Sequence, residues 1–113
     1  MTTIFTKIIN KELDADIVYE DSLALAFNDI LPQAPIHILI IPKKEIPTIN
    51  DIADSDKLIV GHLFIVAKKI AKSMNIAENG YRIIFNCNQD AGQTVNHIHI
   101  HFLGGRKFTW PAG

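Results

Sequence analysis

The chain has 113 residues, of which 48% are hydrophobic and 20% are charged, and its formal net charge is −1. This composition excludes a disordered chain, and the small charge gives no electrostatic case for binding nucleic acid or an anionic membrane. One cysteine excludes a disulfide framework, and neither a membrane-length apolar run nor a signal peptide is found, so we expect one cytoplasmic domain over residues 1–113.

A short helix is predicted at the beginning of the chain, with Thr2 or Thr3 as its N-cap and Asn10 near its end. Four strands are predicted where β-branched and other apolar residues alternate or run together, at residues 17–20, 23–28, 36–41 and 81–85. The first two form a hairpin around a turn at Asp21. In the third strand, alternation places His37 on the same face as the apolar residues two and four positions later.

A long helix is predicted from Asp54 or Ser55 to Met74 or Asn75. Its apolar arc is wider than packing on one sheet requires, so the helix is either deeply buried or part of a subunit interface. A polar loop at residues 86–92 follows the next strand and ends in a glycine, which lets backbone N–H groups approach an anion.

Three of the five histidines alternate with apolar residues in the run that follows, at residues 97–103. This period of two predicts a fifth strand with His97, His99 and His101 on one face. With five strands and two helices, the chain is expected to be an α+β domain on an antiparallel sheet.

Three interpretations of these histidines are open: a solvated strand face, a metal site, and chemistry by the imidazoles themselves. The outer Cα atoms lie roughly 13 Å apart at about 3.3 Å per residue, so all three rings cannot easily reach one ion. A zinc site would use His97 and His99 with His37 as third ligand. Alternatively, the middle imidazole attacks a phosphorus atom while its neighbours hold the oxygens.

The run His97-Ile98-His99-Ile100-His101-Phe102-Leu103 resembles the motif of the histidine triad (HIT) family, and the Gly-Gly-Arg and Trp-Pro segments after it are similar to the Hint branch. The resemblance extends over nearly the whole chain, including residues 25–30, 32–35, 37–44, 61–63, 80–82, 92–93, 103–106 and 110–111. It implies a purine nucleoside phosphoramidase that splits the P–N bond of adenosine or guanosine phosphoramidates through a nucleotidyl-histidine, without metal or cofactor.

The resemblance also implies residue roles. His99 would be the nucleophile, with its second ring nitrogen held by the carbonyl of His97, and His101 and His37 would contact the phosphate. Asp29 would bind the ribose hydroxyls. The base and sugar would be enclosed by Phe27, Ile30, Ile8 and Leu39, and the pocket completed by Asn86, Gly92, Gln93 and Val95.

The implied assembly is a homodimer with one continuous ten-stranded sheet, in which the Trp110 tail lies near the partner's site. The chain departs from the family pattern at three positions. Thr94 stands where serine is usual and keeps the hydroxyl but adds a methyl group near the leaving group. Glu45 replaces a frequent histidine, and Asn96 replaces an aromatic residue. Two other functions are considered: a zinc-dependent hydrolase and a non-catalytic nucleotide-binding module.

Overall fold

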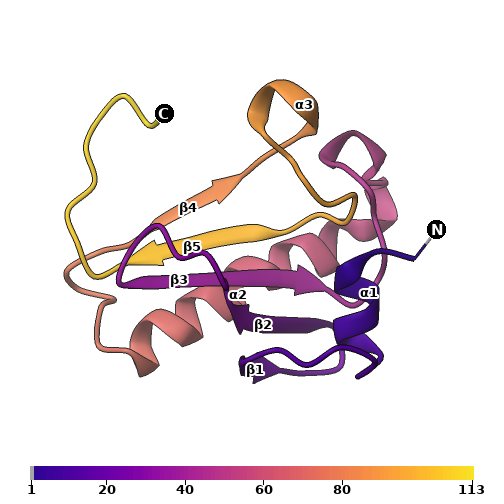
Figure 1. Ribbon diagram of the computed structural model, residues 1–113, viewed down its shortest axis with the longest axis horizontal. Coiled ribbons are helices and arrows are strands. Elements are labelled where there is room, and N and C mark those ends of the chain that lie inside the picture. The colour runs from indigo at the N-terminus through magenta and orange to yellow at the C-terminus, as the bar shows by residue number, and fades with distance from the viewer. Residues whose placement is uncertain (1) are drawn as a thin grey trace.

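A computed structural model describes residues 2–113 as one antiparallel sheet with helices on both faces (Figure 1). The strands are β1 (Ile17–Glu20), β2 (Ala24–Asn28), β3 (Ile36–Pro42), β4 (Arg82–Phe85) and β5 (Ile100–Gly104). The helices are α1 (Ile4–Ile9), α2 (Lys57–Ser73) and α3 (Asn88–Ala91), with short 3-10 turns η1 (Ile49–Asp51) and η2 (Asp54–Asp56) before α2. Among the described residues, no helix is both long and apolar enough to cross a membrane.

The sheet has the order β1-β2-β3-β5-β4, and every neighbouring pair is antiparallel. The central strand β3 pairs with β5 in a register that aligns Leu39 with His101 and His37 with Leu103. Side chains at these positions point to the same face, so His37 and His101 are diagonal neighbours on it. This register brings together two histidines that are 64 residues apart in the sequence.

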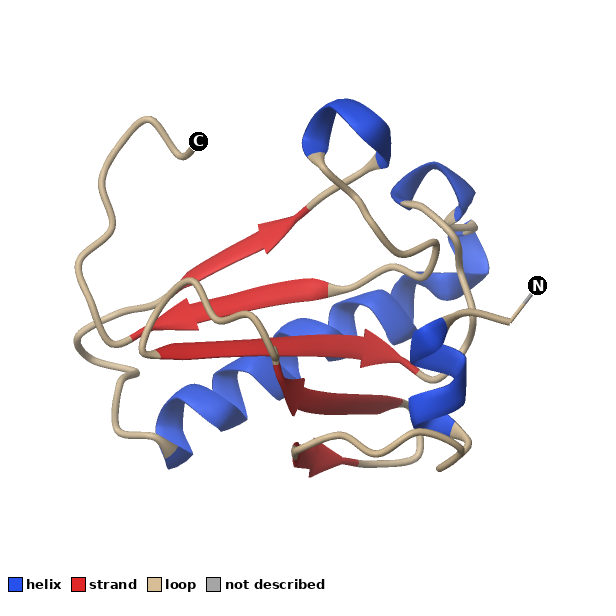
Figure 2. Cartoon of the chain, in the orientation of Figure 1, coloured by secondary structure: helices blue, strands red, loops and turns tan. Residues whose placement is uncertain are grey.

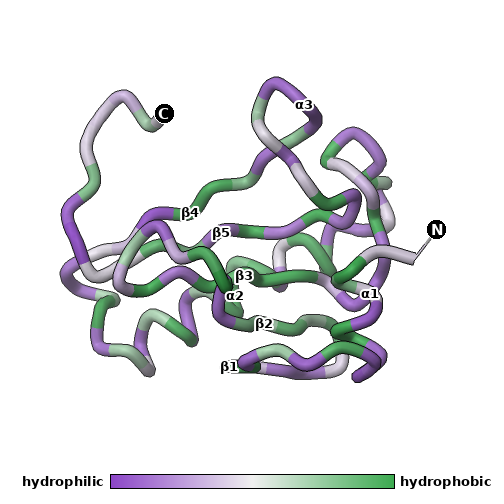
Figure 3. Tube along the Cα trace, viewed as in Figure 1, coloured by the Kyte–Doolittle hydropathy of each residue, from purple (hydrophilic) through white to green (hydrophobic). Residues whose placement is uncertain are grey.

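The two faces of the sheet carry separate hydrophobic cores because side chains alternate along each strand. Helix α2 covers one face and packs against Ile38, Ile40, Ile100 and Phe102. Helix α1 covers part of the other face, where Phe5 and Ile8 contact Phe27, Leu39 and Ile41. Figure 3 shows this hydrophobic character along β2 and β3 and hydrophilic residues around α3. The uncovered remainder of the second face is the one on which His37 and His101 lie.

The predicted α+β architecture with five antiparallel strands and one long helix is confirmed. The predicted strand through all three histidines is wrong in its extent, because β5 begins at Ile100. Its partner β3 ends at Pro42, which has no N–H to continue the ladder, and the N–H of Ile98 donates instead to the carbonyl of Ile46. The predicted loop at residues 86–92 contains α3, a single turn that ends at Gly92 in the left-handed conformation.

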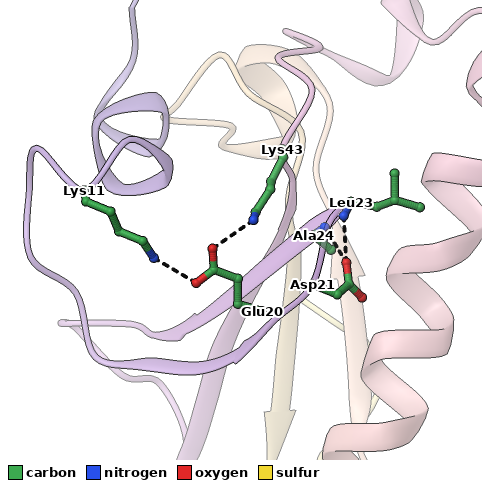
Figure 4. Close-up of polar contacts among 6 residues, drawn as sticks. All are labelled: Lys11, Glu20, Asp21, Leu23, Ala24 and Lys43. Atoms are coloured by element: carbon green, nitrogen blue, oxygen red, sulfur yellow. Dashed lines mark hydrogen bonds and ion pairs between the residues drawn. The ribbon is translucent and has the colours of Figure 1, made fainter.

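The turn of the β1–β2 hairpin is held by Asp21. Figure 4 shows its contacts with Leu23 and Ala24, and a further hydrogen bond with His62 joins the turn to α2. One carboxylate oxygen accepts the backbone N–H groups of Leu23 and Ala24, and the other accepts Tyr19 Oη–H and His62 Nε2–H. Partial burial raises the pKa of Asp21, but these hydrogen bonds outweigh burial and hold it well below its usual range.

Beside this turn, a second polar group ties the segment after α1 to the ends of β1 and β3. The Glu20 carboxylate is bridged by Lys11 and Lys43, each at 2.8 Å. Hydrogen bonds from these two lysines lower the pKa of Glu20. All three side chains are at least partly exposed, so this network contributes less to stability than the multiple hydrogen bonds of Asp21.

Replacing Asp21 with Ala is expected to lower the free energy of unfolding at pH 7 by about 2 kcal/mol, because it leaves partly buried donors without an acceptor. A depressed folded-state pKa stabilises the protein above the unfolded pKa of about 3.9, and this stabilisation is lost as pH falls below it. The difference between the two proteins should therefore be smaller at pH 3 than at pH 7. Urea unfolding of the wild type and the variant at pH 3 and at pH 7 measures this difference in unfolding free energy. Glu12→Ala is the matched control, and an Asp21→Ala loss that is no larger contradicts the prediction.

Candidate active site

His99 is held with one ring nitrogen free. It lies in the extended segment leading into β5 and is only 5% exposed, with the ring of Phe5 packed edge-on at 5.1 Å. Its Nδ1–H donates to the carbonyl of His97 at 2.8 Å, so Nε2 carries the lone pair. Burial lowers the pKa of His99 and outweighs the opposing effects of this hydrogen bond and of Asp29. The ring is therefore neutral at pH 7 and has an unprotonated nitrogen.

His97 is fully buried, and its ring is hydrogen-bonded to the backbone. Its Nε2–H donates to the carbonyl of Pro42 at 2.7 Å, at the end of β3. Burial lowers the pKa of His97, and its Nδ1 has no hydrogen-bond partner among residues 2–113. The contribution of this residue is therefore the fixed direction of its own carbonyl, which accepts the proton of His99.

A chain of hydrogen bonds sets the proton positions of the other two histidines. The backbone N–H of Gln33 donates to Nδ1 of His37 at 3.0 Å, so the proton of neutral His37 must be on Nε2. That Nε2 lies 2.9 Å from Nδ1 of His101, which must accept it. His101 therefore carries its proton on Nε2, where it can be donated to a ligand.

Both rings of this pair remain neutral near pH 7. Burial lowers the pKa of His37, against the opposing charge of Asp29. Burial also lowers the pKa of His101 to about 4, with further lowering by His99 and His37. Asp29 Oδ2 lies 3.4 Å from His37 Nε2, and Oδ1 accepts the N–H of Leu31. The carboxylate is therefore held at the end of β2 beside the histidine pair.

A cleft of about 670 Å³ opens beside His99 and His101. The predicted site residues that line it are Ile8, Phe27, Asp29, Ile30, Leu39, Thr94, Val95, His99 and His101. Ile30 is 91% exposed and lies at its rim, whereas Phe27 and Leu39 form its floor in the core under α1. The cleft thus has an apolar interior, one carboxylate, and two imidazoles at its inner end.

Five of the predicted residues lie outside this cleft, and one of them is the buried His97, whose ring is hydrogen-bonded to the carbonyl of Pro42. Asn86 lines a second cavity on the far side of His101, and His37 lines that cavity as well. Gly92 and Gln93 belong to the loop between α3 and β5. The side chain of Gln93 accepts the N–H of Asn88 and donates to the carbonyls of Pro47 and Val95, so it shapes the loop that carries Thr94.

Other cleft residues were missed by the sequence analysis. Phe5 lies within the predicted first helix, and in the structure its ring contacts the ring of His99. The segment between α1 and β1 forms one wall, where Asp16 accepts a hydrogen bond from Asn28 at 2.8 Å. The residues missed are Ile4, Phe5, Leu13, Asp14, Ala15, Asp16 and Asn28. No sequence motif predicts this wall, because it is formed by the path of the backbone between α1 and β1.

The structure corrects the ligand set expected for a metal. The zinc interpretation used His97, His99 and His37, but His97 Nε2 donates to a backbone carbonyl at the end of β3. Among residues 2–113, the group whose ligand atoms lie within 4.8 Å of one another is Asp29, His37 and His101. In that group the facing nitrogens of the two histidines are already hydrogen-bonded to each other. A cation there would have to displace this hydrogen bond.

Residues 10–108 match the sequence model of the HIT domain family. The chain is 56% identical to the purine nucleoside phosphoramidase of Escherichia coli K12 over 92% of this chain and 87% of that protein. The crystal structure of a HIT family hydrolase from Legionella pneumophila superimposes with a TM-score of 0.97 at 52% identity, covering 99% and 100% of the two chains. A histidine triad nucleotide-binding protein from Candida albicans has a TM-score of 0.83 at 31% identity, covering 99% and 85%.

The hydrogen-bond geometry predicts one neutral tautomer for each ring at pH 7. The proton should be on Nδ1 of His99 and on Nε2 of His97, His37 and His101. Imidazole ¹⁵N NMR measures these positions, and a titration should give His101 a pKa of about 4. A proton on Nδ1 of His37, or titration of His101 near the usual imidazole pKa of about 6.5, contradicts the assignment.

Proposed function

The chain belongs to the HIT domain family, and we propose that it hydrolyses the P–N bond of adenosine or guanosine phosphoramidates to the nucleoside monophosphate and an amine. The observation that carries this proposal is the neutral, buried His99, whose unprotonated Nε2 is available beside a nucleotide-sized cleft. The 56% identical phosphoramidase supports the reaction and the purine base. The proposed location is the cytoplasm.

In the first chemical step, Nε2 of His99 forms a bond to the α-phosphorus. The P–N bond on the opposite side breaks, its electron pair stays on nitrogen, and the nitrogen takes a proton that the Thr94 hydroxyl relays from solvent as the amine leaves. As the bond between Nε2 of His99 and phosphorus forms, His99 becomes positively charged, and the carbonyl of His97 stabilises the Nδ1–H that remains. This hydrogen bond therefore strengthens as the reaction proceeds.

In the second step, a water oxygen attacks the same phosphorus and loses a proton to solvent, and the electron pair of the bond between Nε2 and phosphorus returns to His99. His101 donates its Nε2–H to a phosphate oxygen in both steps. His37 keeps that proton in place by occupying Nδ1 of His101. The chemistry described uses only protein groups and water.

The nucleoside is proposed to occupy the cleft. Asp29 accepts the ribose hydroxyls, and the base lies between apolar side chains of α1 and β2 and the exposed Ile30. The proposed phosphate-side residues are Asn86, Gly92, Gln93, Thr94 and Val95. The Thr94 hydroxyl makes no hydrogen bond to residues 2–113, so it is free to donate to the leaving group. Gln93 acts indirectly by holding this loop.

A zinc-dependent hydrolase is the second candidate, supported by the grouping of Asp29, His37 and His101. It differs from the first in requiring a bound cation and in forming no nucleotidyl-protein intermediate. A non-catalytic nucleotide-binding module would bind in the same cleft without turnover. Both alternatives are separated from the proposal by the experiment that follows.

Replacing His99 with Ala removes the nucleophile and should lower turnover by about a thousandfold or more, as removal of a nucleophile generally does. Binding of nucleoside monophosphate should persist, because Asp29 and the apolar walls remain. Rapid quench with labelled adenosine phosphoramidate should trap an adduct on the wild-type protein and none on the variant. Replacing His101 with Ala should cost less, because it removes a donor and leaves the nucleophile.

The control for this experiment is exhaustive chelation. Turnover and adduct should be unchanged after chelation, whereas activity restored only by zinc would favour the metal candidate. An adduct that forms equally well without His99, or on His97 in the wild type, overturns the assignment of roles. Nucleotide binding without turnover supports the non-catalytic module.

We further propose that the protein is a homodimer in which β4 pairs with β4 of a second copy, giving one continuous ten-stranded sheet. β4 is an edge strand with a regular register, whereas the other edge, β1, has an irregular register. Helix α2 exposes Leu58, Phe64 and Ile65 at 85%, 46% and 48%, more apolar surface than a solvated helix face requires. Trp110, 82% exposed, is proposed to lie near the partner's site.

Sedimentation equilibrium at micromolar concentration should give about twice the chain mass of 12.6 kDa. Ile65→Asp places a charge on the exposed apolar side of α2 and should shift the equilibrium toward monomer. Lys7→Asp, on α1 at the opposite face of the sheet, is the control and should remain dimeric. A wild-type protein that sediments as a monomer contradicts the proposal.

A further inference from the structure

The wall of the nucleotide cleft between α1 and β1 is acidic. It is formed by residues 10–16, which make neither a helix nor a strand (Figure 2). Asp14 and Asp16 of this segment line the cleft together with Asp29, and the lining contains no Lys or Arg. The three carboxylates do not serve to attract the phosphate, because a nucleotide is itself an anion. They therefore suit hydrogen-bond donors of the nucleoside.

Both ends of this wall are fixed to the fold. At one end, the backbone N–H of Glu12 donates to the carbonyl of Lys7 in α1 at 2.8 Å. At the other end, the backbone N–H of Asn28 donates to the carbonyl of Asp16 at 3.0 Å, and the Asn28 side chain donates to Asp16 Oδ2 at 2.8 Å. Asp14 lies between these two attachments, so its backbone is held at the cleft.

The Asp14 carboxylate has both oxygens unused. It makes no hydrogen bond or ion pair to residues 2–113, although it lines the cleft. The other two carboxylates of the lining are partly occupied, because Asp16 accepts from Asn28 and Asp29 accepts the N–H of Leu31. Asp14 is therefore the carboxylate of this cleft that can accept two hydrogen bonds side by side.

The order of groups in a nucleotide indicates which part would meet Asp14. A phosphorus atom at His99 and a ribose at Asp29 leave the base farther from the histidines, since the ribose joins the phosphate to the base. Asp29 follows Asn28, which is bonded to Asp16, so the wall begins beside the ribose position. Apolar side chains of α1 and β2 cover the faces of the base. Its polar edge then reaches the part of the wall where Asp14 lies.

We propose that Asp14 selects guanine over adenine by accepting N1–H and one N2–H of guanine with its two carboxylate oxygens. This inference rests on the proposed function and narrows its substrates to guanosine phosphoramidates. Two adjacent N–H donors match the spacing of a carboxylate. Adenine instead has an acceptor at N1, and this lone pair would face the negative charge of Asp14. The same carboxylate therefore favours one purine and disfavours the other.

The test compares phosphoramidates of guanosine, inosine and adenosine that carry the same amine. The measured quantity is the ratio of kcat/KM between bases, because the P–N bond and the leaving group are identical. The wild type should favour guanosine over adenosine about tenfold, the size expected for one paired contact. Inosine should fall between them, because it keeps N1–H and lacks the N2 amino group.

Asp14→Asn replaces one acceptor oxygen with a donor of the same shape, so the ratio of guanosine to adenosine should fall to about one. Glu12→Gln is the matched control, because it removes a charge from the same segment at a residue that does not line the cleft. It should keep the wild-type ratio.

Three outcomes overturn the role of Asp14. A wild-type ratio of guanosine to adenosine of one or less shows no guanine selection. An equal loss for all three bases in Asp14→Asn means that Asp14 only shapes the wall. The same fall of the ratio in Glu12→Gln means that the charge of the segment, and not a contact with the base, sets the preference.

Binding separates failure of the selection from failure of the reaction. Calorimetry with the wild type measures the affinities for guanosine and adenosine monophosphate, which need no turnover. If the wild type cleaves none of the three phosphoramidates, the proposed function is wrong. The selection is still judged by whether guanosine monophosphate binds about tenfold more tightly and whether Asp14→Asn removes the difference. Equal affinities for the two nucleotides overturn the selection, whatever the turnover.

Discussion

The hydrogen bond from the backbone N–H of Gln33 to Nδ1 of His37 determines which ring nitrogens of His37 and His101 carry protons. A backbone N–H is only a donor, so His37 must accept there and donate from Nε2, and His101 must then present a proton from its own Nε2. If His101 donated to His37 instead, the proton of neutral His37 would be on Nδ1, and two N–H donors would face each other between Gln33 and His37. The order of donors is thus fixed by one peptide group outside the histidine motif.

The sheet register supplies what this hydrogen bond needs. β3 and β5 are antiparallel, and the alignment of Leu39 with His101 makes His37 a diagonal neighbour of His101. The loop before β3 turns back so that the N–H of Gln33 reaches the ring four residues later. At the other end, Pro42 ends the ladder and leaves its carbonyl for His97, which in turn directs its carbonyl to His99. Two strand ends therefore orient all four rings.

The sequence predicts the elements well where the spacing of apolar residues follows their burial, as in β3 and α2. It also identifies His99 as the central ring of the motif. It does not predict that β5 begins only at Ile100, because the end of a ladder depends on the partner strand. The role of Gln33 is also invisible in the sequence, since every residue except proline has the same N–H. Arg82 and Arg106 are 24 positions apart, and nothing in the sequence shows that both guanidinium groups lie against the ring of Phe108.

The burial that suits these rings to phosphoryl chemistry also opposes folding in acid. Burial is the first cause of the lowered pKa of His37, His97, His99 and His101. In the unfolded chain these rings take up protons near their usual pKa of about 6.5, so below that pH the unfolded state binds more protons and stability falls until the folded pKa values are reached. Nδ1 of His97 adds a buried acceptor without a partner among residues 2–113. The fold therefore gives up stability to keep an unprotonated nitrogen at His99 and a directed proton at His101.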